Sequence, residues 1–86
     1  MSSESKTVII YAPLIDGKVR EFLVHTWMFK TGDWVPANIE LAYLDFGEGI
    51  YTTPAEESGF LEVVANASST VKSGDIIGGI RPWKVG

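Results

Sequence analysis

Short runs of β-branched and aromatic residues, separated by polar and glycine-containing segments, recur along the chain. Six such runs can be recognised, at residues 7–11, 18–24, 39–44, 49–53, 60–65 and 76–80. Runs of this length and composition are typical of β-strands, and none of the apolar residues forms a long stripe at helical spacing. The pattern therefore predicts an all-β protein.

Turn signals separate most of these runs. They contain Gly next to Asp, Glu or Ser, and they lie at 16–17, 31–33, 47–49, 58–59 and 73–75. Glycine adopts a positive φ without steric cost, and an Asp side chain can accept a hydrogen bond from the backbone of its own turn. Strands at such short and regular spacing favour a sandwich or a barrel.

An internal match without gaps occurs at an offset of 42 residues, the distance from Gly32 to Gly74. The segment 30–35 lies over 72–77, and each has a basic residue, a small hydroxyl residue, Gly-Asp and two apolar residues. The same offset places Gly17 over Gly59 and several apolar positions over one another. The match predicts two copies of one β-unit that cover each other around a pseudo-twofold axis.

Size and composition limit what the chain can be. Its 86 residues suffice for one compact domain, and 45% of them are hydrophobic. A net charge of −4 argues against nucleic acid or an anionic membrane as a partner, because both reward clustered Lys and Arg. The sequence has no cysteine, which excludes disulfides, thiolate nucleophiles and Cys-ligated zinc.

The segment 1–6 is polar, and no apolar run approaches the length of a membrane span or the shape of a signal peptide. We therefore expect a disordered N-terminal tail over 1–6, a single domain over 7–83 and a cytoplasmic location.

Several weak motifs, in a consistent order, resemble the biotinyl/lipoyl carrier domains. The segment 27–35 looks like the "W…GD.V" corner of that family. The segment 54–61 is similar to the "sP.sG.v" that follows the modified hairpin, and 71–77 to the closing "v..Gd.l". The resemblance covers residues 8–80 and implies a barrel-sandwich hybrid, a flattened arrangement of two small antiparallel sheets with a pseudo-twofold internal repeat.

In that family a tight exposed hairpin joins the two halves and carries Asp-Lys-Ala or Met-Lys-Met, and the lysine amine forms an amide with lipoate or biotin. Counting back from Gly59 places Glu48 at the lysine position, and no lysine occurs anywhere from Thr31 to Val71. A carboxylate cannot form this amide, because both cofactors attach through a carboxyl group of their own. The resemblance thus implies a lipoyl/biotinyl-like domain without an attached cofactor.

The segment around Glu48 is also a candidate partner-binding site. Asp45 and Phe46 lie beside it, and an exposed acidic tip with an exposed aromatic neighbour would form a protruding contact surface for a protein partner. The competing interpretation is a plain hairpin tip, in which glycine allows the turn and Glu48 keeps it soluble. Trp83 follows the last run and is a further candidate for partner binding.

No catalytic residues and no metal site are expected. His25 is the sole histidine, and no nucleophile motif or second ligand lies near it in the sequence. Glu56 and Glu57 are adjacent, so in a strand they would point to opposite faces. For Trp27 and Trp34 the small size of the domain favours the core, with an exposed binding patch as the alternative.

Three functions remain open at this point. The first is a non-enzymatic module that binds or scaffolds an unknown protein partner. The second is a degenerate regulatory subunit of a biotin- or lipoate-dependent multienzyme system. The third is a small-ligand binder.

Overall fold

The computed structural model describes residues 7–83, so the expected tail over 1–6 lies outside the described residues. The described part of the chain forms eight strands and contains no helix. The strands are β1 (Val8–Tyr11), β2 (Glu21–Trp27), β3 (Trp34–Val35), β4 (Glu40–Asp45), β5 (Ile50–Pro54), β6 (Gly59–Val63), β7 (Thr70–Lys72) and β8 (Ile76–Arg81).

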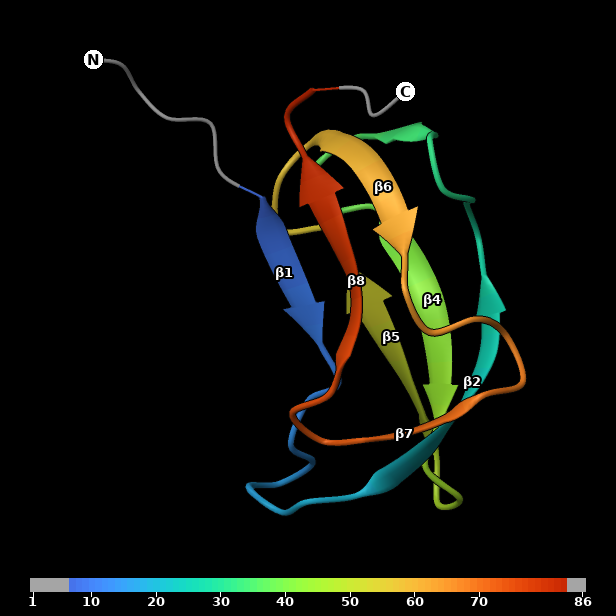
Figure 1. Ribbon diagram of the computed structural model, residues 1–86. Coiled ribbons are helices and arrows are strands. Elements are labelled where there is room, and N and C mark those ends of the chain that lie inside the picture. The colour runs from blue at the N-terminus through green and yellow to red at the C-terminus, as the bar shows by residue number, and fades with distance from the viewer. Residues whose placement is uncertain (1–6, 84–86) are drawn as a thin grey trace.

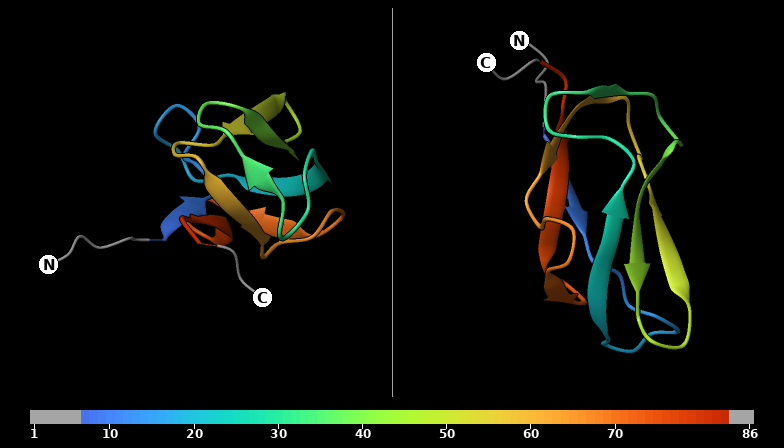
Figure 2. Two further views of the ribbon diagram at one scale, coloured as in Figure 1. Left: turned by 90° about the horizontal axis from the view of Figure 1, so that it is seen from above. Right: turned by 90° about the vertical axis from the view of Figure 1, so that its right-hand side faces the viewer.

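The strands form two four-stranded sheets, β1-β8-β6-β3 and β5-β4-β2-β7, and every paired neighbour is antiparallel. The sheets pack face to face as a flattened sandwich (Figure 1; Figure 2, right). No strand pairing joins the two sheets among residues 7–83, so the sandwich does not close into a barrel. The predicted all-β fold with two small antiparallel sheets is confirmed.

Six of the strands coincide with the predicted runs to within about three residues at each end. The other two, β3 and β7, have two and three residues, too few to show an alternation in the sequence. Each contributes one buried valine, Val35 or Val71, to the core between the sheets. The largest fully buried side chains of that core are Phe22, Val24, Val35, Leu41, Leu44, Leu61, Ile77 and Ile80.

The two sheets are related by the predicted internal repeat. Replacing β1, β2, β3 and β4 by β5, β6, β7 and β8, and the reverse, converts the strand order of one sheet into that of the other. The pairing registers agree as well. Leu61 pairs with Ile80 as Val24 pairs with Leu44, and Val8 pairs with Ile80 as Tyr51 pairs with Leu44.

The gapless offset of 42, however, is wrong for most of the repeat. In the observed register Val8 corresponds to Tyr51, an offset of 43, whereas Leu44 corresponds to Ile80 and Val24 to Leu61, offsets of 36 and 37. The connection between β1 and β2 spans 12–20, but the connection between β5 and β6 spans only 55–58. The shorter connection accounts for most of the change in offset.

Irregular backbone positions follow the same corrected register. Gly32 and Ser68 both have positive φ and differ by 36, as do Asn38 and Gly74. The pairings of β1 with β8 and of β5 with β4 are both irregular at their corresponding ends. Two copies of one β-unit therefore form the domain, with six residues fewer between the first and second strands of the second copy and one fewer between its second and third strands.

The two Gly-Asp turns that suggested the wrong offset have the same local geometry at different places in the fold. Asp33 accepts a hydrogen bond from the backbone N–H of Lys30 at 2.9 Å, and Asp75 accepts one from Lys72 at 2.8 Å. The first turn leads into β3 and the second into β8, and these strands do not correspond in the repeat. The shared motif reflects a shared turn requirement, since Gly supplies the positive φ and Asp binds the turn backbone.

The two tryptophans that flank the first turn have different environments. Trp27 packs against the core, and its indole N–H donates to the carbonyl of Ala65 at 2.8 Å. Its ring also lies close to Gly78, where a Cβ atom would be 3.1 Å from the indole. Trp34 instead points outward and is 55% exposed. The core prediction is confirmed for Trp27 and wrong for Trp34, because Val35 takes the inward position of β3.

Candidate functional site: the β4–β5 hairpin

The hairpin between β4 and β5 joins the two copies of the repeat and lies at the end of the molecule away from the start of β1 and the end of β8 (Figure 1; Figure 2, right). Asp45 pairs with Ile50, and the N–H of Phe46 donates to the carbonyl of Gly49 at 3.0 Å. Gly47 and Glu48 are therefore the two central residues of a tight turn.

The turn is fixed by its own residues. Gly47 has a φ of 89°, and a positive φ at the first central position of a two-residue hairpin favours glycine. The Asp45 carboxylate accepts a hydrogen bond from the N–H of Gly47 at 2.8 Å. At Gly49 a Cβ atom would lie 3.1 Å from the ring of Phe46, so the absence of a side chain lets that ring fold over the backbone.

Phe46 anchors the hairpin to the domain. Its ring packs edge-on against the fully buried Phe22, with 6.1 Å between the ring centroids. The guanidinium of Arg20 lies 5.6 Å from the centroid of the Phe46 ring, a distance typical of a cation–π contact. Phe46 is therefore less exposed than expected, because its ring is half-buried against the core, and its role in partner binding stays a prediction.

Glu48 is the most prominent charged group of the turn. Its side chain is 70% exposed, and one of its oxygens lies 2.8 Å from the guanidinium of Arg20. Arg20 belongs to the connection between β1 and β2, so the ion pair joins this connection to the hairpin. An ion pair this exposed contributes little to stability, about 0–1 kcal/mol, but it orients the carboxylate.

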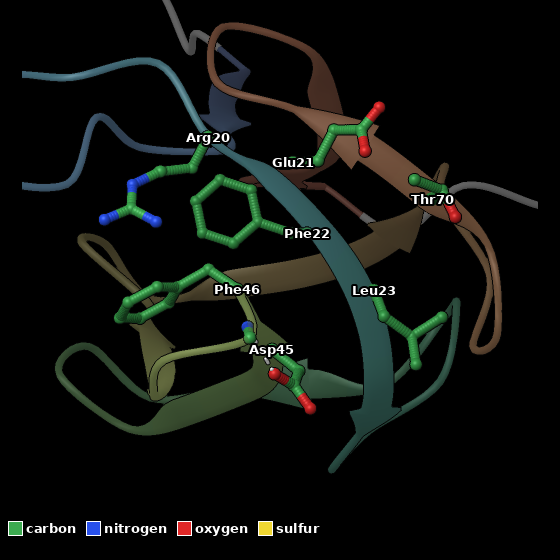
Figure 3. Close-up of a pocket in the computed structure, with 8 residues that line it drawn as sticks. Arg20, Glu21, Phe22, Leu23, Asp45, Phe46 and Thr70 are labelled. Atoms are coloured by element: carbon green, nitrogen blue, oxygen red, sulfur yellow. Dashed lines mark hydrogen bonds between the residues drawn. The ribbon is translucent and has the colours of Figure 1, made fainter.

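A shallow open depression of about 500 Å³ lies beside the hairpin. Figure 3 shows Phe22, Phe46 and Arg20 gathered on one side of β2, whereas Glu21 and Leu23 extend from its other side. The carboxylates at 21 and 45 and the guanidinium at 20 give this depression a mixed charge. The hairpin and the depression beside it thus present acidic and hydrogen-bonding groups to solvent from an ordered backbone.

The remaining candidate residues lie apart from this hairpin. Trp83 is 47% exposed and follows β8, a strand that ends at the opposite end of the molecule from the hairpin (Figure 1). Glu56 and Glu57 are both exposed in the bend after β5, rather than in a strand. His25 is exposed on β2. No group of three His, Cys, Asp or Glu side chains within residues 7–83 is placed to hold a metal ion.

A second hollow of about 360 Å³ lies between the edge strands β1 and β5. Its lining is mixed, polar and apolar, and includes Thr53, which is 3% exposed. The hydroxyl oxygen of Thr53 has no hydrogen-bond partner among residues 7–83. This feature has no signal in the sequence, because Thr is common on both faces of strands.

No helix occurs in residues 7–83, and so none there has the length and apolar character to cross a membrane. No known family model matches the chain, and a comparison with curated proteins finds no match.

Proposed function

We propose that this chain is a lipoyl/biotinyl-like domain that carries no cofactor, catalyses no reaction and binds a protein partner through its β4–β5 hairpin. One observation carries the proposal. Glu48 is the second central residue of the tight, exposed turn that joins the two copies of the repeat. In the carrier domains that the sequence resembles, the hairpin between the halves bears the modified lysine.

The correspondence extends to the neighbours of Glu48. If Glu48 takes the place of the lysine in Asp-Lys-Ala, then Gly47 replaces the aspartate and Gly49 the alanine. Each glycine has a structural reason at its position. Gly47 has a positive φ, and Gly49 leaves room for the close approach of the Phe46 ring. The hairpin thus keeps the tight turn that a carrier needs while lacking the amine that a carrier modifies.

A binding role is supported by how firmly the turn is held. Arg20 contacts both the Glu48 carboxylate and the Phe46 ring, and Phe46 packs on the buried Phe22. Binding costs less conformational entropy when the contact residues are already ordered. An ordered acidic tip at one end of the domain favours a partner surface that offers cationic or hydrogen-bond-donating groups.

The experiment is affinity capture with the full chain as bait in an extract of its native host, with quantitative mass spectrometry of the bound proteins. Glu48→Arg reverses the charge of the tip, and Glu57→Arg makes the same change at an exposed carboxylate at the far end of β5. We expect at least one protein whose recovery falls about tenfold or more with Glu48→Arg and is kept with Glu57→Arg. Equal recovery of every bound protein with both variants would contradict the proposal.

A further inference from the structure

The internal repeat allows the outer faces of the two sheets to be compared position by position. On the outer face of the β1-β8-β6-β3 sheet, five outward positions hold large apolar residues: Ile9, Tyr11, Trp34, Phe60 and Ile76. Their counterparts on the other sheet, by the pairing registers, are Thr52, Pro54, Thr70, Leu23 and Glu40. The same backbone positions are thus mostly polar on one sheet and apolar on the other, so the fold itself does not require the apolar residues.

These residues form two apolar groups on one face of the sheet. Trp34 and Phe60 lie at one end, where Phe60 pairs with Arg81, and Glu62 with Gly79 forms the next outward pair before the second group. Trp34 pairs with Phe60, and Tyr11 pairs with Ile76, in neighbouring strands. Val64, directly after β6, is 54% exposed, and its backbone bonds to Ile77 of β8. The apolar face is defined here as Ile9, Tyr11, Trp34, Phe60, Val64 and Ile76. It belongs to the sheet formed by the blue, red and orange strands β1, β8 and β6 in Figure 1.

The size of the apolar face fits an interface. Trp34 and Tyr11 are slightly more than half exposed, and the three aliphatic residues are between 40% and 54% exposed. With about 150–250 Å² for an aromatic side chain and about 100 Å² for an aliphatic one, the face exposes about 350 Å² of apolar surface. Two such faces bring about 700 Å², roughly 60% of an interface of about 1,200 Å², which is the lower end of specific protein interfaces.

The charged residues on this face are arranged so that they can pair with those of a second copy of the same face. Among the outward strand positions described for this sheet, the charged residues are Glu62 on β6 and Arg81 on β8. They form an ion pair at 2.6 Å, with side chains 41% and 32% exposed. When a second copy is related to the first by a twofold rotation, Arg81 of each copy faces Glu62 of the other, so opposite charges meet.

We propose that the apolar face binds a second copy of this chain and forms a symmetric dimer of two sheets packed face to face. Each copy buries Trp34, Tyr11 and Ile76 against the other, and the two Glu62–Arg81 pairs exchange partners across the axis. The β4–β5 hairpin belongs to the other sheet and points from one end of the domain, so it stays free in this dimer. The dimer does not depend on the binding role proposed for that hairpin.

The oligomeric state of the full chain tests the proposal, by sedimentation velocity over a series of protein concentrations. We expect a monomer–dimer equilibrium with dissociation in the micromolar range. Ile76→Glu introduces the residue that the corresponding backbone position holds as Glu40, and it should weaken dimerisation by about 100-fold or more, because each dimer would bury two unpaired carboxylates. Leu23→Glu adds the same charge to the outer face of the other sheet and should change the dissociation constant by less than about threefold.

A mixing experiment separates contact between copies from support within one copy. Glu62→Arg gives a chain with two cations on the face, and Arg81→Glu gives one with two anions. Each variant alone should remain monomeric, whereas an equal mixture should restore dimers, since cationic and anionic faces then meet. Circular dichroism is the control that both variants are folded. A monomer for the unaltered chain at every concentration, an unchanged dimer with Ile76→Glu, or no dimer in the mixture would overturn the proposal.

Discussion

Replacing Thr53 by Val should stabilise the domain. Thr53 is 3% exposed, and within the described part of the chain its hydroxyl oxygen has no hydrogen-bond partner. Valine has nearly the same shape, with a methyl group in place of the hydroxyl. The repeat supplies an internal precedent, because the position corresponding to Thr53 in the other copy is Ile10, a buried β-branched apolar residue.

The size of the effect follows from this burial. An unpartnered buried hydroxyl costs about 1–3 kcal/mol in proteins. Burying a methyl group in its place adds a favourable contribution of up to about 0.8 kcal/mol. Small steric adjustments offset part of this gain, so we expect the free energy of unfolding to rise by about 1–2 kcal/mol. For a domain of this size the midpoint temperature should rise by about 4–8 °C for each kcal/mol.

The assay is urea denaturation followed by tryptophan fluorescence, supported by calorimetry, at protein concentrations low enough that self-association adds no stability. Thr52→Val, at the next position of β5 but on the outer face, is the matched control and should change stability by less than about 0.5 kcal/mol. Equal or lower stability of Thr53→Val would refute the reasoning, because it would mean that the hydroxyl makes a favourable interaction in solution.

Three further changes test other parts of the structure. Gly59→Ala should destabilise the fold by about 3 kcal/mol, because its Cβ would lie 2.5 Å from the carbonyl oxygen of Arg81. Ser58→Ala, at an exposed position, is the control, and similar urea midpoints for the two variants would contradict this close approach. Trp27→Phe removes the donor to Ala65 and should lower the unfolding free energy by about 2 kcal/mol, whereas Trp83→Phe should leave it within about 0.5 kcal/mol; equal losses would argue against the core position of Trp27. Glu48→Lys should be labelled by a lipoate or biotin ligase, with an intact mass raised by one cofactor, whereas the unaltered chain should not; failure to label would count against the hairpin correspondence.

Much of the fold could be predicted from the sequence because strand composition and turn residues are local signals. The strands β3 and β7 were not predicted, because a strand of two or three residues shows no periodicity in the sequence. The repeat was predicted but its register was not. The Gly-Asp turns at 32–33 and 74–75 are alike for local reasons, and they matched more strongly than the apolar positions that truly correspond.

The candidate site could be predicted only in part. The turn residues located the hairpin, and the position of Glu48 at its tip followed from them. The burial of Phe46 could not be predicted from the turn residues, because it depends on contacts with Phe22 and Arg20. Arg20 is 28 residues away from Glu48 in the chain. The outward position of Trp34 likewise depends on which residue of β3 faces the core.

We propose that this domain keeps a carrier-like hairpin and carries no cofactor on it. The most direct test is the intact mass of the full chain purified from its native host. We expect a mass explained by the polypeptide alone, and peptide mapping of the segment 45–50 without any addition. A mass raised by one lipoyl or biotinyl group would contradict it.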